Sequence, residues 1–177
     1  PIVITGGVLV PDGVTLTIQK GSRIYLHADA PLLVDGTIKA IGEKFDSTRI
    51  VFQGDRLDEY YRDIPGSWPG IYFRESSTNN LLKQVIIKNA YQGIVCEKPA
   101  SGNGFKLTLE ECIIDNCYDA VILGVNTSIN AVNCLVSNSG TNILFVQGGK
   151  YHFEHSTVAA YSNLYISHKQ PVLAITD

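Results

Sequence analysis

The sequence lacks the features that mark several common functional classes. No apolar run approaches the roughly 18 residues that a membrane-spanning helix requires, so we expect no membrane span. Basic residues are not in excess, since 14 Lys and Arg stand against 17 Asp and Glu for a formal net charge of -3, and we expect no nucleic-acid partner. Charge is also sparse: 18% of the 177 residues are charged and 45% are hydrophobic, which excludes disorder and allows one domain with a continuous core.

A helical period is missing as well. The chain is instead a succession of short runs rich in Val, Ile, Leu, Tyr and Phe, such as RIYL, RIVF, GIYF and AVIL, separated by Gly, Asn, Asp and Pro. Without helices between the strands, a βαβ architecture is excluded. The sequence predicts an all-β protein.

A repeat then narrows the choice among all-β folds. Val85, Cys112, Cys134 and Ser156 fall in register at steps of 27, 22 and 22 residues, and the register extends to Ile87, Ile114, Val136 and Val158. Such a period indicates stacked units that bury their apolar faces against one another. Three short strands and three turns of this length make one coil of a parallel β-helix. We therefore predict a solenoid of about six to seven coils, with residues 1–177 forming a single domain.

The same register aligns three asparagines, Asn89, Asn116 and Asn138, two residues after the inward apolar position. At a turn, an inward amide can bond the asparagine of the next coil and the turn backbone. The repeat predicts a structural asparagine ladder at these three positions.

The segment VLVPDGVTLTIQKGSRIYLHADAPLLVDGTIKAIG, followed by IVFQGDR and PGSWPGIYF, resembles the coils of right-handed parallel β-helix proteins of the pectin-lyase-like superfamily. The similarity extends over essentially the whole chain and is nearest to secreted or surface-attached β-helix proteins of Bacteroidota with undefined activity. It implies a right-handed helix and an extracellular or cell-surface, outer-membrane-associated location. Both ends of the chain resemble interrupted strands, and we expect a piece of a longer protein or a mature product with covered ends.

The outward acidic residues do not converge on a catalytic cluster. Glu110 and Asp115 lie in rows with Lys83, Val132, Lys88 and Ser137, which is typical of a solvated face. We predict no catalytic residues, no metal and no cofactor in this segment. The four cysteines are predicted to be buried thiols, because neighbouring positions on paired strands such as Cys112 and Cys134 make a poor disulfide; their even count in an exported chain would also permit disulfides.

An insertion at 54–69 interrupts the coils and carries the candidate ligand-binding residues. Aromatic rings beside carboxylates and arginines suit sugar binding, because ring faces contact C–H surfaces and charged groups contact hydroxyls. The alternative is a loop held by Arg–Asp pairs with its tryptophan packed against the solenoid. The candidates are Asp55, Arg56, Asp58, Tyr60, Tyr61, Arg62 and Trp68.

Two outward rows are predicted to be apolar, one of Ile86, Ile113 and Leu135 and the other of Val95, Ile122 and Leu144. Contiguous apolar rows require a cover. The cover would be the inserted loop, a neighbouring domain or a second protein. Alternatively, a bulge turns one row inward.

These features support three hypotheses. The first, which we favour, is a non-catalytic cell-surface or secreted module that binds a glycan or a protein partner. The second is a polysaccharide lyase or hydrolase whose catalytic coils lie outside this segment. The third is a structural subunit of an outer-membrane assembly, because open β-helix ends require capping.

Overall fold

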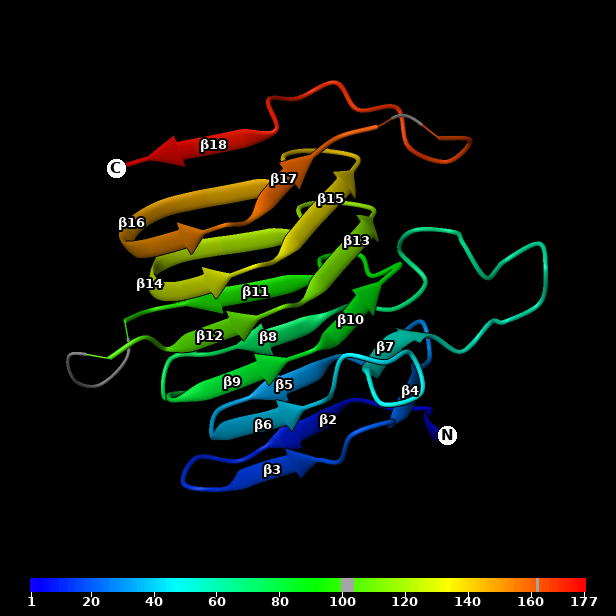
Figure 1. Ribbon diagram of the computed structural model, residues 1–177, viewed down its shortest axis with the longest axis horizontal. Coiled ribbons are helices and arrows are strands. Elements are labelled where there is room, and N and C mark those ends of the chain that lie inside the picture. The colour runs from blue at the N-terminus through cyan, green and yellow to red at the C-terminus, as the bar shows by residue number, and fades with distance from the viewer. Residues whose placement is uncertain (100–103, 162) are drawn as a thin grey trace.

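The computed structural model describes residues 1–99, 104–161 and 163–177, and these form a parallel β-helix. Every strand pairing is parallel, as stacking of like residues from coil to coil predicted. Figure 1 shows the coils stacked in chain order, with the N-terminus and the C-terminus at opposite ends of the stack. The predicted all-β solenoid is confirmed.

Three faces surround the core. Face A is a sheet of seven strands in chain order, which agrees with the predicted six to seven coils. Its strands are β1 (Ile2–Ile4), β4 (Arg23–Leu26), β7 (Ile50–Gly54), β10 (Val85–Lys88), β13 (Ile113–Cys117), β15 (Leu135–Ser139) and β17 (Thr157–Ala159).

The other two faces belong to one sheet that folds around a corner. Two long strands, β14 and β16, run from face B onto face C and join the two. Face B holds β2 (Val8–Val10), β5 (Leu32–Val34), β8 (Ile71–Phe73), β11 (Ile94–Glu97), β18 (Leu173–Thr176) and the first parts of β14 (Ile122–Val132) and β16 (Leu144–Glu154). Face C holds β3 (Thr15–Ile18), β6 (Thr37–Ile41), β9 (Asn80–Lys83), β12 (Leu107–Glu110) and the second parts of β14 and β16.

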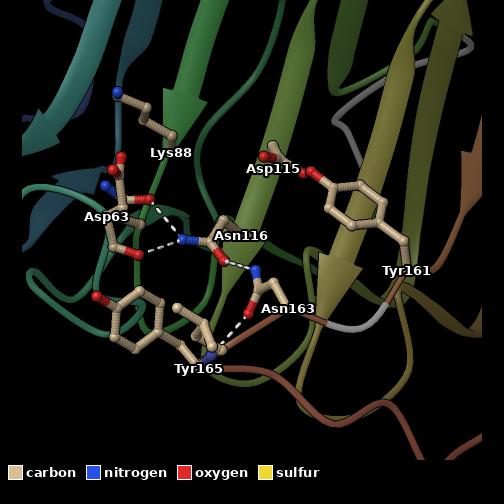
Figure 2. Close-up of a pocket in the computed structure, with 9 residues that line it drawn as sticks. Asp63, Lys88, Asp115, Asn116, Tyr161, Asn163 and Tyr165 are labelled. Atoms are coloured by element: carbon tan, nitrogen blue, oxygen red, sulfur yellow. Dashed lines mark hydrogen bonds between the residues drawn. The ribbon is translucent and has the colours of Figure 1, made fainter.

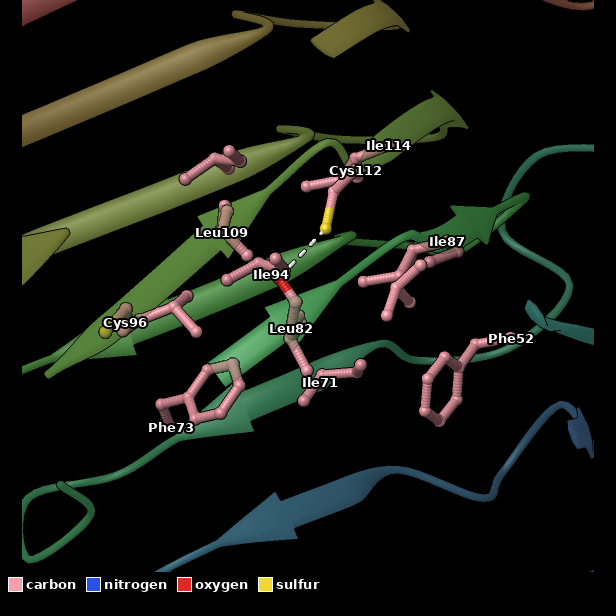
Figure 3. Close-up of a cluster of buried hydrophobic side chains, with 14 of the residues drawn as sticks. Phe52, Ile71, Phe73, Leu82, Ile87, Ile94, Cys96, Leu109, Cys112 and Ile114 are labelled. Atoms are coloured by element: carbon pink, nitrogen blue, oxygen red, sulfur yellow. Dashed lines mark hydrogen bonds between the residues drawn. The ribbon is translucent and has the colours of Figure 1, made fainter. Parts of the chain in front are cut away.

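The predicted register is also confirmed. Ile87 pairs with Ile114, Ile114 with Val136, and Val136 with Val158. Their side chains join a single apolar core in which one residue type stacks on the same or a similar one. Figure 3 shows part of this core, with Phe52 and Ile87 from face A beside Ile71 and Ile94 from face B.

Left-handed residues bracket the strands of face A and explain how each coil turns its corners. Before the strand stand Gln84, Glu111, Asn133 and His155, and after it stand Asn89, Asn116 and Asn138, all with φ between 48° and 63°. Asparagine tolerates this conformation because its short polar side chain bonds the local backbone. The repeated Asn is therefore a requirement of the corner.

All four cysteines are free and buried, as predicted. Burial raises the pKa of Cys96 to about 11 and raises the pKa values of Cys112 and Cys117 well above the usual range. The Cys112 thiol donates to the carbonyl of Leu82 at 3.2 Å. These thiols act as small apolar core residues.

Candidate functional site

The insertion predicted at 54–69 leaves the solenoid between β7 and β8 and projects from the corner that joins face A to face B (Figure 1). Two asparagines of the ladder hold its return path. The Asn89 amide donates to the carbonyl of Arg62 at 2.6 Å, and the Asn116 amide donates to the carbonyl of Asp63 at 2.8 Å. The ladder therefore fixes the corners of the solenoid and also positions the insertion.

The ladder itself is formed between two of its three members. Asn116 donates to Asn89 Oδ1 at 2.8 Å, as predicted. Asn138 is buried and left-handed like the other two, but its Oδ1 accepts the backbone N–H of Tyr161 at 2.9 Å. The ladder stops at Asn138 because the amide of Asn163, from the C-terminal segment, donates to Asn116 Oδ1 at 3.3 Å in its place.

We expect Asn116→Ala to loosen the insertion and to destabilise the protein. The change removes three side-chain hydrogen bonds, with Asp63, Asn89 and Asn163, and forces alanine into a left-handed conformation, so the expected loss is roughly 2–3 kcal/mol in the free energy of unfolding. Urea unfolding measures this loss, and hydrogen exchange follows residues 58–66. Asn116→Gly keeps the conformation without strain, so it should retain part of the stability while exchange in the insertion still rises. Unchanged exchange in both variants would contradict this role of Asn116.

The charged residues of the predicted ligand patch on the insertion are already paired with other side chains of the protein. Asp55 accepts from His27 at 2.7 Å, and the Asp55 carboxylate raises the pKa of His27. Arg56 pairs with Asp58 at 3.2 Å and lies 3.9 Å from the ring centre of Tyr61. Arg62 pairs with its neighbour Asp63, whereas the ring of Tyr60 is 72% exposed. The charged groups hold the loop together, as the alternative interpretation expected.

The prediction that Trp68 contacts a ligand is wrong. Its side chain is fully buried, and its Nε1–H donates to the carbonyl of Lys88 at 2.9 Å. The backbone of Trp68 forms a parallel β-bridge with Ala90 of the next coil, and the Trp68 side chain belongs to the apolar core at the base of the insertion. A large aromatic side chain at the base of a loop gains more from this burial than from exposure to solvent.

One of the two predicted apolar rows is confirmed as an outward row. Ile86 pairs with Ile113, and Ile113 pairs with Leu135, on the outer surface of face A. The row continues to Val51 of β7. Its members are partly exposed, apart from the better covered Val51.

The prediction of a second outward row of Val95, Ile122 and Leu144 is wrong, because the register is shifted by one residue after Val95. Ile122 and Leu144 are buried in the core, where Ile94 pairs with Ile122 and Ile122 pairs with Leu144. The outward residue beside Ile94 is Val95, which pairs with Tyr72 and Leu123. The turn after Asn116 holds one residue more than the turn after Asn89, and one residue inverts the alternation of a strand. This is the alternative in which one row is turned inward.

A second outward row of face A runs beside the apolar one, and it is polar. Tyr25 pairs with Gln53, and Lys88 pairs with Asp115, which pairs with Ser137. A hollow of about 450 Å³ lies over both rows. Val51, Ile86 and Ile113 form its apolar side, which ends at Arg23. Tyr25, Gln53, Lys88 and Asp115 form its polar side.

A second hollow, of about 340 Å³, begins where the first ends, because Lys88 and Asp115 line both. Its walls are the insertion, through Asp63, and the C-terminal segment, through Tyr161 and Tyr165 (Figure 2). Asn163 connects the walls, since its amide donates to Asn116 Oδ1 at 3.3 Å and its own Oδ1 accepts the N–H of Tyr165 at 2.8 Å. We call the two hollows together the face A groove.

Asp115 has the most distinctive environment in the groove. It is half-buried, and burial raises its pKa, although the Ser137 hydroxyl donates to Oδ1 at 2.6 Å and Lys88 lies nearby. Figure 2 shows the Tyr161 hydroxyl directed toward the Asp115 carboxylate. Lys88 and Asp115 were predicted to lie on a solvated face, and Tyr161 and Tyr165 were not predicted as site residues. Their signal was the stretch YSNLYISHK at 161–169, which departs from the repeat as the first insertion does.

Comparison with protein-family models identifies residues 6–158 as a right handed beta helix region. The chain belongs to the right-handed β-helix family. Comparison with curated proteins found no match, and neither did comparison with solved structures. Within this β-helix, no group of three or more His, Cys, Asp or Glu gathers among the described residues, and no described helix is long and apolar enough to cross a membrane.

Proposed function

We propose that this β-helix binds a carbohydrate chain in the face A groove. The observation that supports the proposal most strongly is the pair of parallel rows, one apolar and one polar, that lie side by side along the groove. A sugar has the same two-sided character, because its C–H faces are apolar and its rim of hydroxyls is polar. The fold family alone says little about ligand or activity, so the proposal rests on these residues.

The groove suits a chain of several sugar units better than a single sugar. Its two hollows meet at Lys88 and Asp115, and together they extend from β4 to the C-terminal segment. Across this length, Lys88 donates to sugar oxygens, Asp115 accepts from hydroxyls, and the rings of Tyr25, Tyr161 and Tyr165 offer stacking surfaces. A polymer of this kind is met outside the cell or at its surface, and the proposal includes that location, in keeping with the resemblance to secreted pectin-lyase-like proteins.

Replacing Lys88 and Asp115, which line both hollows, tests the proposal. We expect Lys88→Ala and Asp115→Asn each to weaken binding roughly tenfold, because a hydrogen bond to a charged group contributes about 1.5–3 kcal/mol. A glycan array selects the ligand, and isothermal titration calorimetry measures the affinities. Lys83→Ala is the matched control, since Lys83 is also half-exposed, pairs with Glu110 at 2.9 Å and lies outside the groove. Equal affinities for Lys83→Ala and Lys88→Ala would refute the proposal.

Glycan cleavage is the second candidate, and Asp115 is the observation that favours it. A half-buried carboxyl with a raised pKa, next to a tyrosine hydroxyl, is the type of group that can donate a proton to a leaving sugar oxygen. Incubation of the protein with each glycan that it binds, followed by assays for new reducing ends and for unsaturated uronate, separates the two functions. Turnover that Asp115→Asn abolishes would establish cleavage, and the absence of products would leave binding alone.

A further inference from the structure

Two exposed tyrosines, Tyr91 and Tyr118, lie two residues after the ladder asparagines Asn89 and Asn116, on the side of face B. The rings of Tyr91 and Tyr118 are stacked, with centroids 5.3 Å apart and planes at 22°, although they are 46% and 58% exposed. They follow Ala90 and Cys117, which belong to the core. The ring pair thus stands on a rigid base at the surface of the β-helix, and neither ring lines the face A groove.

A fixed carboxylate stands next to these rings. Asp119 Oδ2 accepts from Gln92 Nε2 at 2.8 Å, and its Oδ1 accepts from Thr141 Oγ1 at 2.7 Å. These three residues come from successive coils and form a polar row beside the aromatic one. Each carboxylate oxygen can accept a further hydrogen bond, so Asp119 is an oriented acceptor at the surface.

The aromatic row ends in a notch. In the coil after Tyr118, the equivalent position is Gly140, whose N–H donates to the carbonyl of Cys117. A Cβ on Gly140 would lie 2.3 Å from the carbonyl oxygen of Tyr118, so the fold admits no side chain there. One strand spacing, about 4.8 Å, is left beside the ring of Tyr118 above a floor of glycine backbone.

We propose that Tyr118, Asp119 and Gly140 form a second carbohydrate site, which takes a neutral hexose ring. The C–H face of the sugar lies against the ring of Tyr118 above Gly140 and continues the stack that Tyr91 and Tyr118 begin. Its hydroxyls donate to Asp119. A uronic acid is disfavoured, because its carboxylate would meet the negative charge of Asp119. This site does not depend on the face A groove.

A quaternary ammonium ion is the other ligand that an aromatic ring and a carboxylate attract. Such ions are held by several rings that surround the cation. Tyr91 and Tyr118 instead lie one above the other, which offers a flat end to the stack. The geometry therefore favours the C–H face of a hexose ring.

The test measures how variants of the two sites bind four neutral hexasaccharides, namely cello-, laminari-, manno- and malto-hexaose. Choline chloride is the cation probe. Calorimetry or ligand-observed NMR measures affinity. We expect at least one hexaose to bind the wild type, Tyr118→Ala and Asp119→Asn to weaken it about tenfold, and Tyr118→Phe to retain it within twofold. Phe45→Ala is the control, because Phe45 is 73% exposed, belongs to neither site and should leave hexaose binding unchanged.

The outcomes distinguish this site from the groove. A hexaose whose binding falls with Tyr118→Ala and persists with Lys88→Ala supports the second site. Binding that falls with Lys88→Ala and is unchanged by Tyr118→Ala supports the groove and overturns the second site. The proposal is also overturned if no hexaose binds the wild type, or if choline binds through Tyr118 and the hexaoses do not. Thermal unfolding of each variant verifies that it is folded.

Discussion

Lys106→Met should destabilise the protein by about 3 kcal/mol or more in the free energy of unfolding, because each buried acceptor left without a partner costs about 1–3 kcal/mol. The Lys106 side chain is fully buried, and its ammonium donates to the carbonyls of Arg74, Glu75 and Glu97 at 2.9, 2.9 and 2.6 Å. These carbonyls lie just after β8 and at the end of β11, where the coil passes from face B to face C. One charge therefore joins two coils at a corner.

Urea unfolding of wild type and variant measures the effect, and Lys20→Met provides the control. Lys20 pairs with Glu43 at the surface, and both side chains are more than half exposed. Its replacement should change stability by less than about 0.5 kcal/mol. A Lys106→Met protein as stable as Lys20→Met would contradict the assignment.

Burial lowers the pKa of Lys106, whereas the three carbonyls favour its charged form.

Trp68→Ala should cost about 3–5 kcal/mol in the free energy of unfolding, the usual penalty for deleting a buried aromatic side chain. Trp68 has no exposed surface, and its indole donates to the carbonyl of Lys88. The loss should appear as a lower midpoint in urea at an unchanged slope.

Two further variants separate the parts of this effect. Trp68→Phe keeps most of the apolar volume and loses the hydrogen bond, so its loss should be clearly smaller. Tyr60→Ala removes an aromatic ring from the same insertion where it is exposed, and stability should be unchanged within about 0.5 kcal/mol. If Trp68→Ala and Tyr60→Ala were equally stable, the burial of Trp68 would not contribute to folding.

The sequence was sufficient to predict the fold because a stacked repeat is a local property. Each coil places Ile or Val at the same inward position, so the register of Ile87, Ile114 and Val136 could be found by counting. Counting failed at Ile122 and Leu144, where a turn gained one residue. The length of a turn changes the phase of a strand without changing its composition, and only the pairing in three dimensions reveals the change.

The groove was harder to predict than the fold. Lys88 and Asp115 belong to the regular repeat and are ordinary outward residues in the sequence. They become parts of one hollow because the insertion and the C-terminal segment, about 100 residues apart in the chain, close over the same corner. For Trp68 the sequence left two interpretations open, contact with a ligand and packing against the solenoid, because an aromatic residue in a polar loop is compatible with both.

The sequence by itself determined the all-β class, the stacking of coils, the inward rows of face A and the asparagine corners, because each of these depends on neighbouring residues and on a fixed period. Only the tertiary structure decided which outward residues share a surface and that Trp68 and Lys106 are buried. It also decided that Tyr118 lies next to Gly140, a position without a side chain. These features depend on where loops without a repeat come to rest against the solenoid. That placement follows from long-range packing and hydrogen bonding, such as the bond from Asn116 to the carbonyl of Asp63, which no local pattern encodes.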